Sequence, residues 1–583
     1  MDNQRFILVA ALLVLSFWIY IEWHAHFDEE AEPAEEEVVE EEADPDEVPR
    51  PDDEAIPDPE EVADEDPQPE EEAPEPVTAP ERGERIEFAT ASMRGEVDTL
   101  GGELRRLDLP EYRETIDEPD RVRLLDDRPE RIFTVQPGVW SDEGVELPRR
   151  DEMLFELNDS YAVDAEGERV HDGMPDPEAD EALGHVIELV WSNDNGLEIL
   201  RRMHFPHRGY QVQIDQEIRN TGEEDWAGRD YVQIERNDPG ISRSIFDPST
   251  FSHNGPAYHD GDRYERLDFD DLRESALEKR IPGGWAAMVE HYFVAVAIPG
   301  TRPHGDEDKS LTYYTRDLGD NRFRIGFTDS RTTRVEAGES RSFGQRLYLG
   351  PKIQSELRPA APHLERVVDY GIMWIIAQPL FTALDWINRV VGNWGWSIIL
   401  LTLFIKLLFY KLAETSGRSL ARMRKLQPRL QTLRERYADD KQKLNQAMMD
   451  LYKREKVNPA AGCLPILVQI PVFIALYWVL LESAELRHAP WLGWIQDLSS
   501  PDPYYILPVI MGASMFIMQK LNPPPPDPTM RKVIMAMPFM LIFIGIFMPA
   551  GLVLYWAVNN ILSAAQQWKI NRVIEQEGHA KAS

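Results

Sequence analysis

The most constraining feature of this chain is one lysine inside an apolar stretch. Residues Trp394–Leu412 read WGWSIILLTLFIKLLFYKL, and this length and hydrophobicity are typical of a transmembrane helix, which needs about 20 residues. A lysine at the depth of Lys406 costs roughly 2.5–3.5 kcal/mol on insertion scales, so its side chain should face protein or water rather than lipid. Snorkelling toward the interface near Lys411 is the alternative. Alone, Lys406 indicates a functional membrane site and no particular activity.

Charge is divided unevenly along the chain. Residues 28–80 hold 26 acidic residues and one basic residue, whereas residues 351–583 hold 25 basic and 17 acidic residues, within a net charge of −43. This division indicates that the acidic and basic parts of the chain lie in two different compartments, which a single soluble enzyme would not do. The single cysteine, Cys463, excludes an intramolecular disulfide framework.

Residues 1–27 are predicted to form an N-terminal transmembrane anchor. Phe6–Ile21 is an apolar run of 16 residues, and no small-residue cleavage site follows it, which favours an anchor over a cleaved signal peptide. Residues 28–81 form an acidic, proline-rich linker. This composition buries too little apolar surface to offset chain entropy, so we expect a disordered tether.

Residues 82–351 are predicted to form a large extracytoplasmic antiparallel β-sandwich. Apolar and polar residues alternate in Tyr210–Ile214, which is expected to pair with Leu197–Leu200 and Met203–Phe205 across a turn at residues 206–209. Further strands are expected at His185–Trp191, Tyr292–Ile298, Phe323–Phe327 and Phe343–Leu349.

This domain carries no recognisable catalytic motif. The patterns HExxH, GxSxG, paired CxxC and the phosphate-binding loop are all absent from the sequence. His204 and His207 flank the hairpin turn and are interpreted as surface polar residues rather than metal ligands. We therefore expect no enzyme, no catalytic residues, no metal site and no cofactor.

Loop charges predict the membrane topology. Residues 411–460 hold 13 Lys/Arg and 6 acidic residues, whereas residues 483–502 hold one basic residue, so the first segment is cytoplasmic and the second is outside. Trp394–Leu412 then runs inward, in agreement with an external β-domain. Within the linker at 352–393, Tyr370–Leu384 is too short and too closely bracketed by charge to span, and it suits an amphipathic helix in the interface.

Residues 394–583 are predicted to form a five-helix core. Leucines and methionines at helical spacing predict a cytoplasmic helical hairpin over 413–460. Further spans are expected at Leu464–Leu481 and Tyr504–Lys520. Val533–Ala565 would be about 50 Å of helix, too long for one crossing, and its Met-Pro-Ala-Gly turn divides it into two spans. With the anchor, this gives a multi-pass α-helical protein with six transmembrane helices and both termini in the cytoplasm.

The last span carries a polar face. Trp556, Asn559 and Ser563 recur at spacings of three and four residues, which places them on one side of a helix. Polar residues can also join helices to one another without lining a site. The alternative is a water-filled groove lined by these residues together with Lys406, Thr402 and Gln519.

The basic hairpin suits an anionic partner. Its outer faces are rich in arginine and lysine, which fits ribosomal RNA, lipid headgroups or simple solvation equally well. The residues predicted to dock a ribosome on the cytoplasmic side are Arg418, Arg422, Arg424 and Lys425.

Several stretches resemble one known family. The matching segments are Val391–Gly395, Leu426–Pro428, Met448–Lys453, Lys456–Cys463, Asp502–Pro508 and Pro549–Tyr555. Through them the chain from about Val368 to Ile574 resembles the YidC membrane protein insertases of Gram-negative bacteria. The anchor and the large β-domain agree with that family in layout.

The resemblance implies an inner-membrane insertase and chaperone that inserts, folds and helps assemble nascent membrane proteins. A positively charged groove, open to cytoplasm and lipid, would receive the substrate's polar tail. The family's groove charge is normally an arginine, and Lys406 stands at the matching position, which keeps the charge but loses the forked donor geometry. Family positions linked to groove or substrate match Thr402, Phe473, Met511, Gln519, Tyr555 and Trp556. The implied partners are nascent membrane proteins, the Sec translocon (SecYEG and SecDF), the ribosome and membrane lipids.

The alternative function is a small-solute transporter with a periplasmic binding domain. Such a transporter is expected to show inverted repeats or broken helices around a midplane site, and the sequence shows neither. A membrane protease is less favoured still, because the core spans carry no Asp pair, HExxH or GxSxG.

Overall fold

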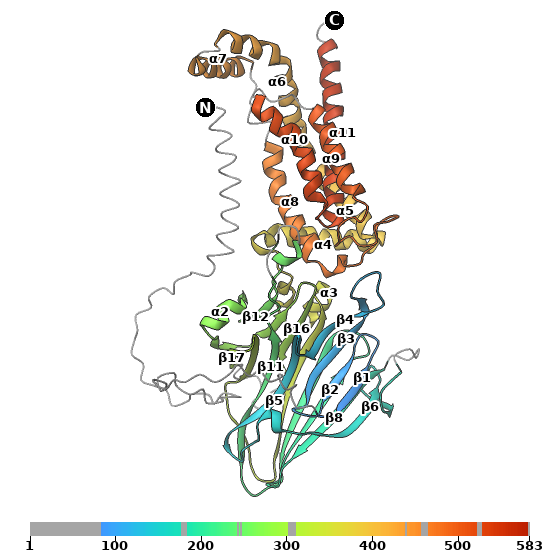
Figure 1. Cartoon of the computed structure of the whole chain (residues 1–583), viewed down its shortest axis with the longest axis vertical. Coiled ribbons are helices and arrows are strands. Elements are labelled where there is room, and N and C mark those ends of the chain that lie inside the picture. The colour runs from blue at the N-terminus through green and yellow to red at the C-terminus, as the bar shows by residue number, and fades with distance from the viewer. Residues whose placement is uncertain are drawn as a thin grey trace, which may run out of the picture.

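The structure, a computed structural model, describes residues 83–176, 183–241, 244, 248–300, 310–437, 440–455, 464–521 and 528–580. The predicted anchor (1–27) and acidic linker (28–81) lie outside these residues. The described chain forms a β-domain and a bundle of helices that stands on one end of it (Figure 1).

Two antiparallel ten-stranded sheets build the β-domain. The first contains, in spatial order, β1 (Arg85–Ala89), β2 (Arg94–Asp98), β3 (Glu103–Arg113), β4 (Arg121–Arg128), β5 (Arg131–Gly144), β11 (Trp226–Asn237), β18 (Arg322–Asp329), β17 (Ser310–Asp317) and β14 (Glu278–Pro282), with β19 (Thr333–Val335) paired to β11. The second contains β13 (Tyr264–Arg266), β12 (Gly255–His259), β15 (Trp285–Val289), β16 (Phe293–Pro299), β20 (Ser340–Pro351), β10 (Gln211–Asn220), β9 (Leu197–Phe205), β8 (Gly184–Ser192), β6 (Glu156–Val163) and β7 (Arg169–Asp172).

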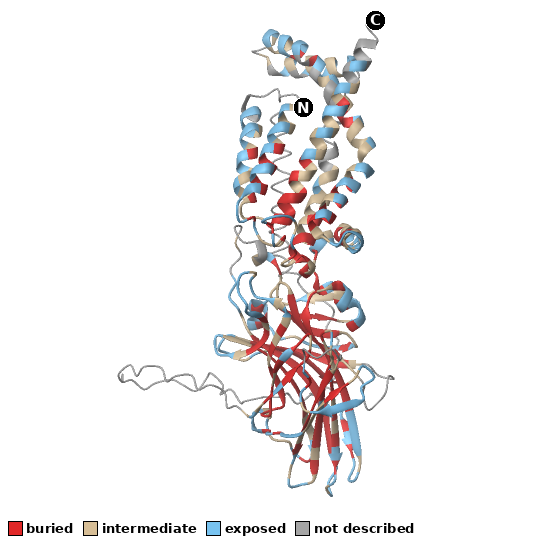
Figure 2. Ribbon diagram, turned by 90° about the vertical axis from the view of Figure 1, so that its right-hand side faces the viewer, coloured by how far each residue is buried: buried red, intermediate tan, exposed pale blue. Residues whose placement is uncertain are grey.

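The core lies between the two sheets, where Figure 2 shows the strands as mostly buried. Val212 and Ile214 on β10 are buried while Gln213 between them is exposed, because successive side chains of a strand point to opposite faces. Phe88 of the first sheet stacks on Phe205 of the second, with ring centroids 3.8 Å apart. The predicted antiparallel β-sandwich is therefore confirmed.

The predicted hairpin forms, but Leu197–Leu200 pairs with Glu217–Asn220, further along β10, rather than with Tyr210–Ile214. Strands β9 and β10 are antiparallel, with Met203 opposite Ile214. The four further predicted strands correspond to β8, β16, β18 and β20.

The helices follow the β-domain in the chain, except for the short α2 (Phe269–Glu274). They are α3 (Gln354–Ala360), α4 (Trp374–Val391), α5 (Trp394–Leu408), α6 (Tyr410–Arg436), α7 (Lys441–Arg454), α8 (Leu464–Glu482), α9 (Ile506–Leu521), α10 (Pro528–Gly545) and α11 (Ala550–Ala580). The apolar stretch 533–565 is divided between α10 and α11, as its turn sequence predicts.

The single helix predicted over Trp394–Leu412 is wrong. Helix α5 ends at Leu408, and α6 begins at Tyr410 after a bend of 63°. Phe409 at the bend has φ −92° and ψ 12°, outside regular helix geometry. Beside the bend, Gln566 of α11 donates to the carbonyl of Tyr410 at 3.4 Å. No proline or glycine marks this point, so local sequence carries no signal for the bend.

Within the described ranges, no single helix combines the length and the hydrophobicity that a membrane crossing requires. The bent pair Trp394–Leu408 and Tyr410–Ser419 meets both requirements only when its two parts are taken together.

Helix α4 lies crosswise at the foot of the bundle, next to the β-domain (Figure 1). It buries Ala377, Phe381 and Leu384 on one side and exposes Trp374 and Trp386 on the other. This amphipathic pattern suits the predicted interfacial helix, whose location in a membrane interface stays a prediction.

Helices α6 and α7 form a small hairpin with its own apolar cluster. The side chain of Asp440 caps α7 by accepting the backbone N–H of Lys443 at 3.0 Å. The cluster that holds the pair together consists of Leu426, Leu430, Met423, Met448, Leu451 and Tyr452.

A polar junction centred on Gln354 joins α3 to the bundle. The side chain of Gln354 donates to the Tyr370 hydroxyl at 2.8 Å and accepts from Gln378 of α4 at 2.8 Å. Its backbone N–H donates to Glu485 Oε1 at 3.2 Å. The other oxygen of Glu485 is buried and has no hydrogen-bond partner among the described residues. Burial raises the pKa of Glu485 to about 7, and the nearby Asp385 carboxylate adds to the shift.

We predict that this junction weakens as pH rises. The pKa of Glu485 is higher in the folded chain than in the unfolded chain, so its favourable contribution is complete below about pH 4.5 and is lost as pH passes about 7. Thermal unfolding of the full chain in detergent should show the wild type losing stability relative to Glu485→Gln across this range. The exposed residue Glu356 on α3 provides the control Glu356→Gln, which should follow the wild type. A difference that stays constant with pH would contradict this assignment.

Candidate functional site

Lys406 lies in the last turn of α5 and reaches across to α11. Its Nζ donates to Ser563 Oγ at 2.7 Å, although the two residues are 157 positions apart. Ser563 Oγ donates in turn to the backbone carbonyl of Asn559 at 2.7 Å. The predicted lysine and two residues of the predicted polar face are thus joined in one chain of hydrogen bonds.

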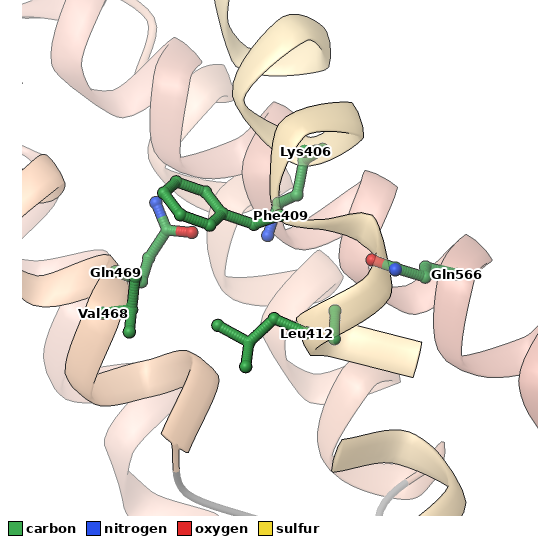
Figure 3. A pocket seen from close by; sticks show the side chains of 7 residues that line it. Lys406, Phe409, Leu412, Val468, Gln469 and Gln566 are labelled. Atoms are coloured by element: carbon green, nitrogen blue, oxygen red, sulfur yellow. The ribbon is translucent and has the colours of Figure 1, made fainter. Parts of the chain in front are cut away.

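A small pocket lies beside Lys406 (Figure 3). Helices α5, α6, α8 and α11 and the bend between α5 and α6 all contribute to it, so its position depends on the bend at Phe409. Two uncharged amides and one ammonium group share it with apolar side chains. Its lining residues are Lys406, Phe409, Leu412, Ala413, Val468, Gln469 and Gln566.

Helix α6 approaches α11 closely just beyond the bend. A Cβ placed on Gly417 would lie 2.9 Å from Ile570 Cδ1 and 3.0 Å from Gln567 Oε1. The absence of a side chain at Gly417 therefore leaves room for the Ile570 and Gln567 side chains where α6 meets α11.

Helix α8 forms the opposite wall through contacts with α11. Gln469 Nε2 donates to the Tyr555 hydroxyl at 2.8 Å, and Tyr555 is 1% exposed. One turn further along α8, the ring of Phe473 lies 4.8 Å from that of Trp556 and 6.2 Å from that of Tyr555. The predicted residues Phe473, Tyr555 and Trp556 are therefore brought together between α8 and α11.

The remaining predicted groove residues lie elsewhere. Thr402 is buried one turn before Lys406. Its hydroxyl donates to the backbone carbonyl of Ile398 on the same helix at 2.7 Å. Gln519 donates to the backbone carbonyl of Ile534 on α10 at 2.8 Å, and Met511 is buried on α9. None of these three lines the Lys406 pocket.

Comparison with known proteins identifies the family. A model described as the 60Kd inner membrane protein matches residues 386–577, and a model of the YidC periplasmic domain matches residues 85–383. The chain is 45% identical to a membrane protein insertase YidC from Alkalilimnicola ehrlichii, over 100% of this chain and 98% of the relative. It is 42% identical to a membrane protein insertase YidC from Thioalkalivibrio sulfidiphilus, over 99% and 100%. This chain belongs to the YidC family.

The family resemblance read from the motifs is thus confirmed. The chain is also similar to a solved structure described as an active YidC insertase with its first transmembrane domain resolved. The two sequences are 18% identical, the TM-score is 0.36, and the match covers 83% of this chain and 92% of the other.

Four residues were predicted to dock a ribosome in this YidC-family chain. Arg418 is paired with Glu414 on its own helix at 3.1 Å, while Arg422 and Lys425 are exposed on α6. The side chain of Arg424 lies outside the described residues. The structure therefore leaves two of these cations open to solvent.

Sequence reasoning missed two of the polar residues at the pocket. Gln469 is the lone amide in the apolar stretch Leu464–Leu481, a signal that could have drawn attention to it. Gln566 follows Ser563 by three residues and so falls near the predicted polar face. Phe409 carried no comparable signal, because it enters the pocket through the bend.

No group of three or more His, Cys, Asp or Glu side chains that could hold a metal ion occurs in the part of the chain that the structure describes. The chemistry that the pocket offers is one cation and two neutral amides.

We predict that the Gln469–Tyr555 hydrogen bond holds α8 against α11. Tyr555→Phe should destabilise the bundle by about 1–3 kcal/mol, because the partly buried Gln469 amide loses its acceptor. The double variant Gln469→Leu/Tyr555→Phe should recover most of that loss, since both polar partners are gone. Denaturant unfolding in detergent gives the free energy of unfolding of the wild type, of each single variant and of the double variant. Strict additivity of the two single effects would show that the pair does not interact.

Proposed function

We propose that this chain inserts membrane proteins by receiving the polar tail of a nascent chain in the pocket beside Lys406. The observation that carries the proposal is the Lys406–Ser563 hydrogen bond at a pocket lined by Gln469 and Gln566. Relatives that are 45% and 42% identical over nearly their full length are named membrane protein insertases, which supports the same activity here.

The physical basis of the proposed activity is local. A polar or acidic tail meets its largest barrier where the bilayer is dry, and a hydrated, positively charged pocket shortens that dry path. The Lys406 ammonium attracts an acidic tail, while neutral amides hydrogen-bond to it without adding a competing charge. The substrate's apolar segment then partitions into lipid, and this burial drives the reaction.

The groove in this proposal extends beyond the pocket itself. Thr402 and Asn559 flank the Lys406–Ser563 pair, and the aromatic group of Phe473, Tyr555 and Trp556 lies along the same α8–α11 contact. Gln519 and Met511 join α9 to the path that a leaving apolar segment would follow.

We further propose that α5, α8, α9, α10 and α11 cross the inner membrane and that the anchor supplies a sixth span. Both termini then lie in the cytoplasm and the β-domain lies in the periplasm, in keeping with the basic loop 411–460 and the matching periplasmic-domain model. Large exposed apolar side chains on the bundle suit contact with lipid; they include Leu403, Phe404, Leu407, Val509, Ile517, Phe539 and Phe543.

The proposed partners follow from charge and exposure. The solvent-exposed Arg422 and Lys425, with Arg418 and Arg424 on the same helix, suit the anionic surface of a ribosome. The exposed tryptophans of α4 suit lipid headgroups. Cooperation with the Sec translocon (SecYEG and SecDF) is proposed from family membership.

We predict that a positive charge, rather than a particular donor geometry, is required at position 406. Lys406→Arg should be near neutral. Lys406→Ala should insert a substrate with an acidic translocated tail about tenfold more slowly, which corresponds to about 1.4 kcal/mol. The rate is measured as the insertion of a single-span substrate into vesicles that contain the reconstituted protein.

Two controls make this test specific. Lys411→Ala removes an exposed lysine five positions further along and should leave the rate unchanged. A substrate with a neutral tail should be affected less than the acidic one by Lys406→Ala. Wild-type insertion of the acidic-tailed substrate by folded Lys406→Ala protein would remove the basis for the proposal.

The proposal also predicts that water reaches the pocket from the cytoplasm. Ser563→Cys, in a background with Cys463→Ser, should react with a membrane-impermeant thiol reagent added on the cytoplasmic side. The exposed lipid-facing residue Ile561 provides the comparison Ile561→Cys, which should react more slowly because a thiol in lipid stays protonated. Equal, slow labelling at both positions would mean that the pocket is dry.

A further inference from the structure

The outer end of α8 is held by residues of the β-domain and by Lys352, which directly follows its last strand. Glu482, the last residue of α8, accepts Lys352 Nζ at 3.1 Å on one carboxylate oxygen and Ser252 Oγ at 2.5 Å on the other. The Lys352 and Glu482 side chains are 1% and 3% exposed, so this ion pair is shielded from water. It joins positions 130 residues apart.

A second contact completes this arrangement. His291, in the turn between β15 and β16, donates from Nε2 to the backbone carbonyl of Leu481 at 3.0 Å. The last carbonyls of a helix have no partner within that helix, and a cation near a helix C-terminus also opposes its dipole favourably. His291 therefore caps the backbone of α8, while Ser252 and Lys352 hold the side chain of its last residue. We call this set the α8 cap (Ser252, His291 and Lys352).

Burying an ion pair is an inefficient way to gain stability. The desolvation of two charges offsets most of their attraction, and apolar residues of similar volume often stabilise a fold equally well. What a buried pair does provide is one defined geometry, because any slip leaves a charge without its partner. The α8 cap is therefore better suited to fixing the position of α8 than to strengthening the junction.

The position of α8 matters at its other end. Gln469 lines the Lys406 pocket and lies 13 residues before Glu482, or about 20 Å along the helix. Phe473 lies between them and packs on Trp556. An axial shift or rotation of α8 would move both side chains relative to α11.

We propose that the α8 cap is a positioning device through which the β-domain sets the register of α8 along the insertion groove. Ser252, His291 and Lys352 are then positioning residues for insertion, although none of them lines the pocket. The consequence for insertion rests on the function proposed above, whereas the consequence for the placement of α8 does not.

The test measures placement and insertion separately. Spin labels on Ile470→Cys of α8 and Ile561→Cys of α11, both exposed positions, report the distance between the helices in the full chain with Cys463→Ser. We expect Lys352→Met to shift or broaden this distance distribution and to lower insertion several-fold. Lys352→Arg should retain both wild-type values. Lys279→Met, which removes the exposed ion pair with Asp260 on the β-domain, is the matched control and should change neither.

A double variant separates positioning from stability. Lys352→Met/Glu482→Leu removes both charges, so thermal stability should return to near the wild-type value while the distance distribution stays broad and insertion stays low. Recovery of insertion together with stability would overturn the proposal, as would an unchanged distance in Lys352→Met. A loss of insertion with no change in distance would count against positioning and leave the proposed function intact.

If Lys352→Met fails to fold, His291→Phe gives the decisive measurement, because it removes the hydrogen bond to the Leu481 carbonyl and keeps an aromatic ring beside Tyr292. It should broaden the distance distribution in a folded protein. A wild-type distribution in His291→Phe would then refute the proposal.

Discussion

The pocket beside Lys406 depends on one constraint: a charged group inside an apolar bundle needs polar partners. Lys406 finds one in Ser563, and that contact ties α5 to α11. The neutral amides of Gln469 and Gln566 stand at the same pocket. Removing an ammonium group from water is costly unless hydrogen bonds or residual water replace its solvation. A pocket that satisfies the charge this way can also accept the polar part of another chain.

The shape of the pocket follows from the bend at Phe409. A straight helix would carry Leu412 and Ala413 onward along the axis of α5, whereas the bent chain places them beside Lys406. Contacts between α6 and α11 follow the bend: Gln566 donates to the Tyr410 carbonyl, and Gly417 lies against Ile570. Helix α11 is thus the element on which both the charge and the bend depend.

The β-domain and the bundle are joined by buried contacts. The core of the β-domain lies between two sheets and continues into the bundle as one apolar cluster, through residues such as Leu364, Val367 and Phe381. Buried polar contacts accompany this apolar contact. Gln354 links α3 to α4 and to Glu485, while Lys352 and Ser252 meet Glu482 at the end of α8. Directional hydrogen bonds and ion pairs tolerate less displacement than apolar packing does. The junction is therefore built to hold a defined orientation between the two parts.

Local patterns in the sequence determined most of the architecture. Two-residue alternation predicted strands such as β10, and the length of the apolar run 533–565 with its Met-Pro-Ala-Gly turn predicted the separation of α10 from α11. Both follow from backbone periodicity, which each short segment carries by itself. The unusual placement of Lys406 and the motifs around it were sufficient to recognise the YidC family. Only the tertiary structure decided the bend at Phe409, the entry of Gln469 and Gln566 into the pocket, and the pairing of Lys352 with Glu482. These features arise where segments distant in sequence meet, and a charge or an amide in one segment cannot reveal which distant residue will satisfy it.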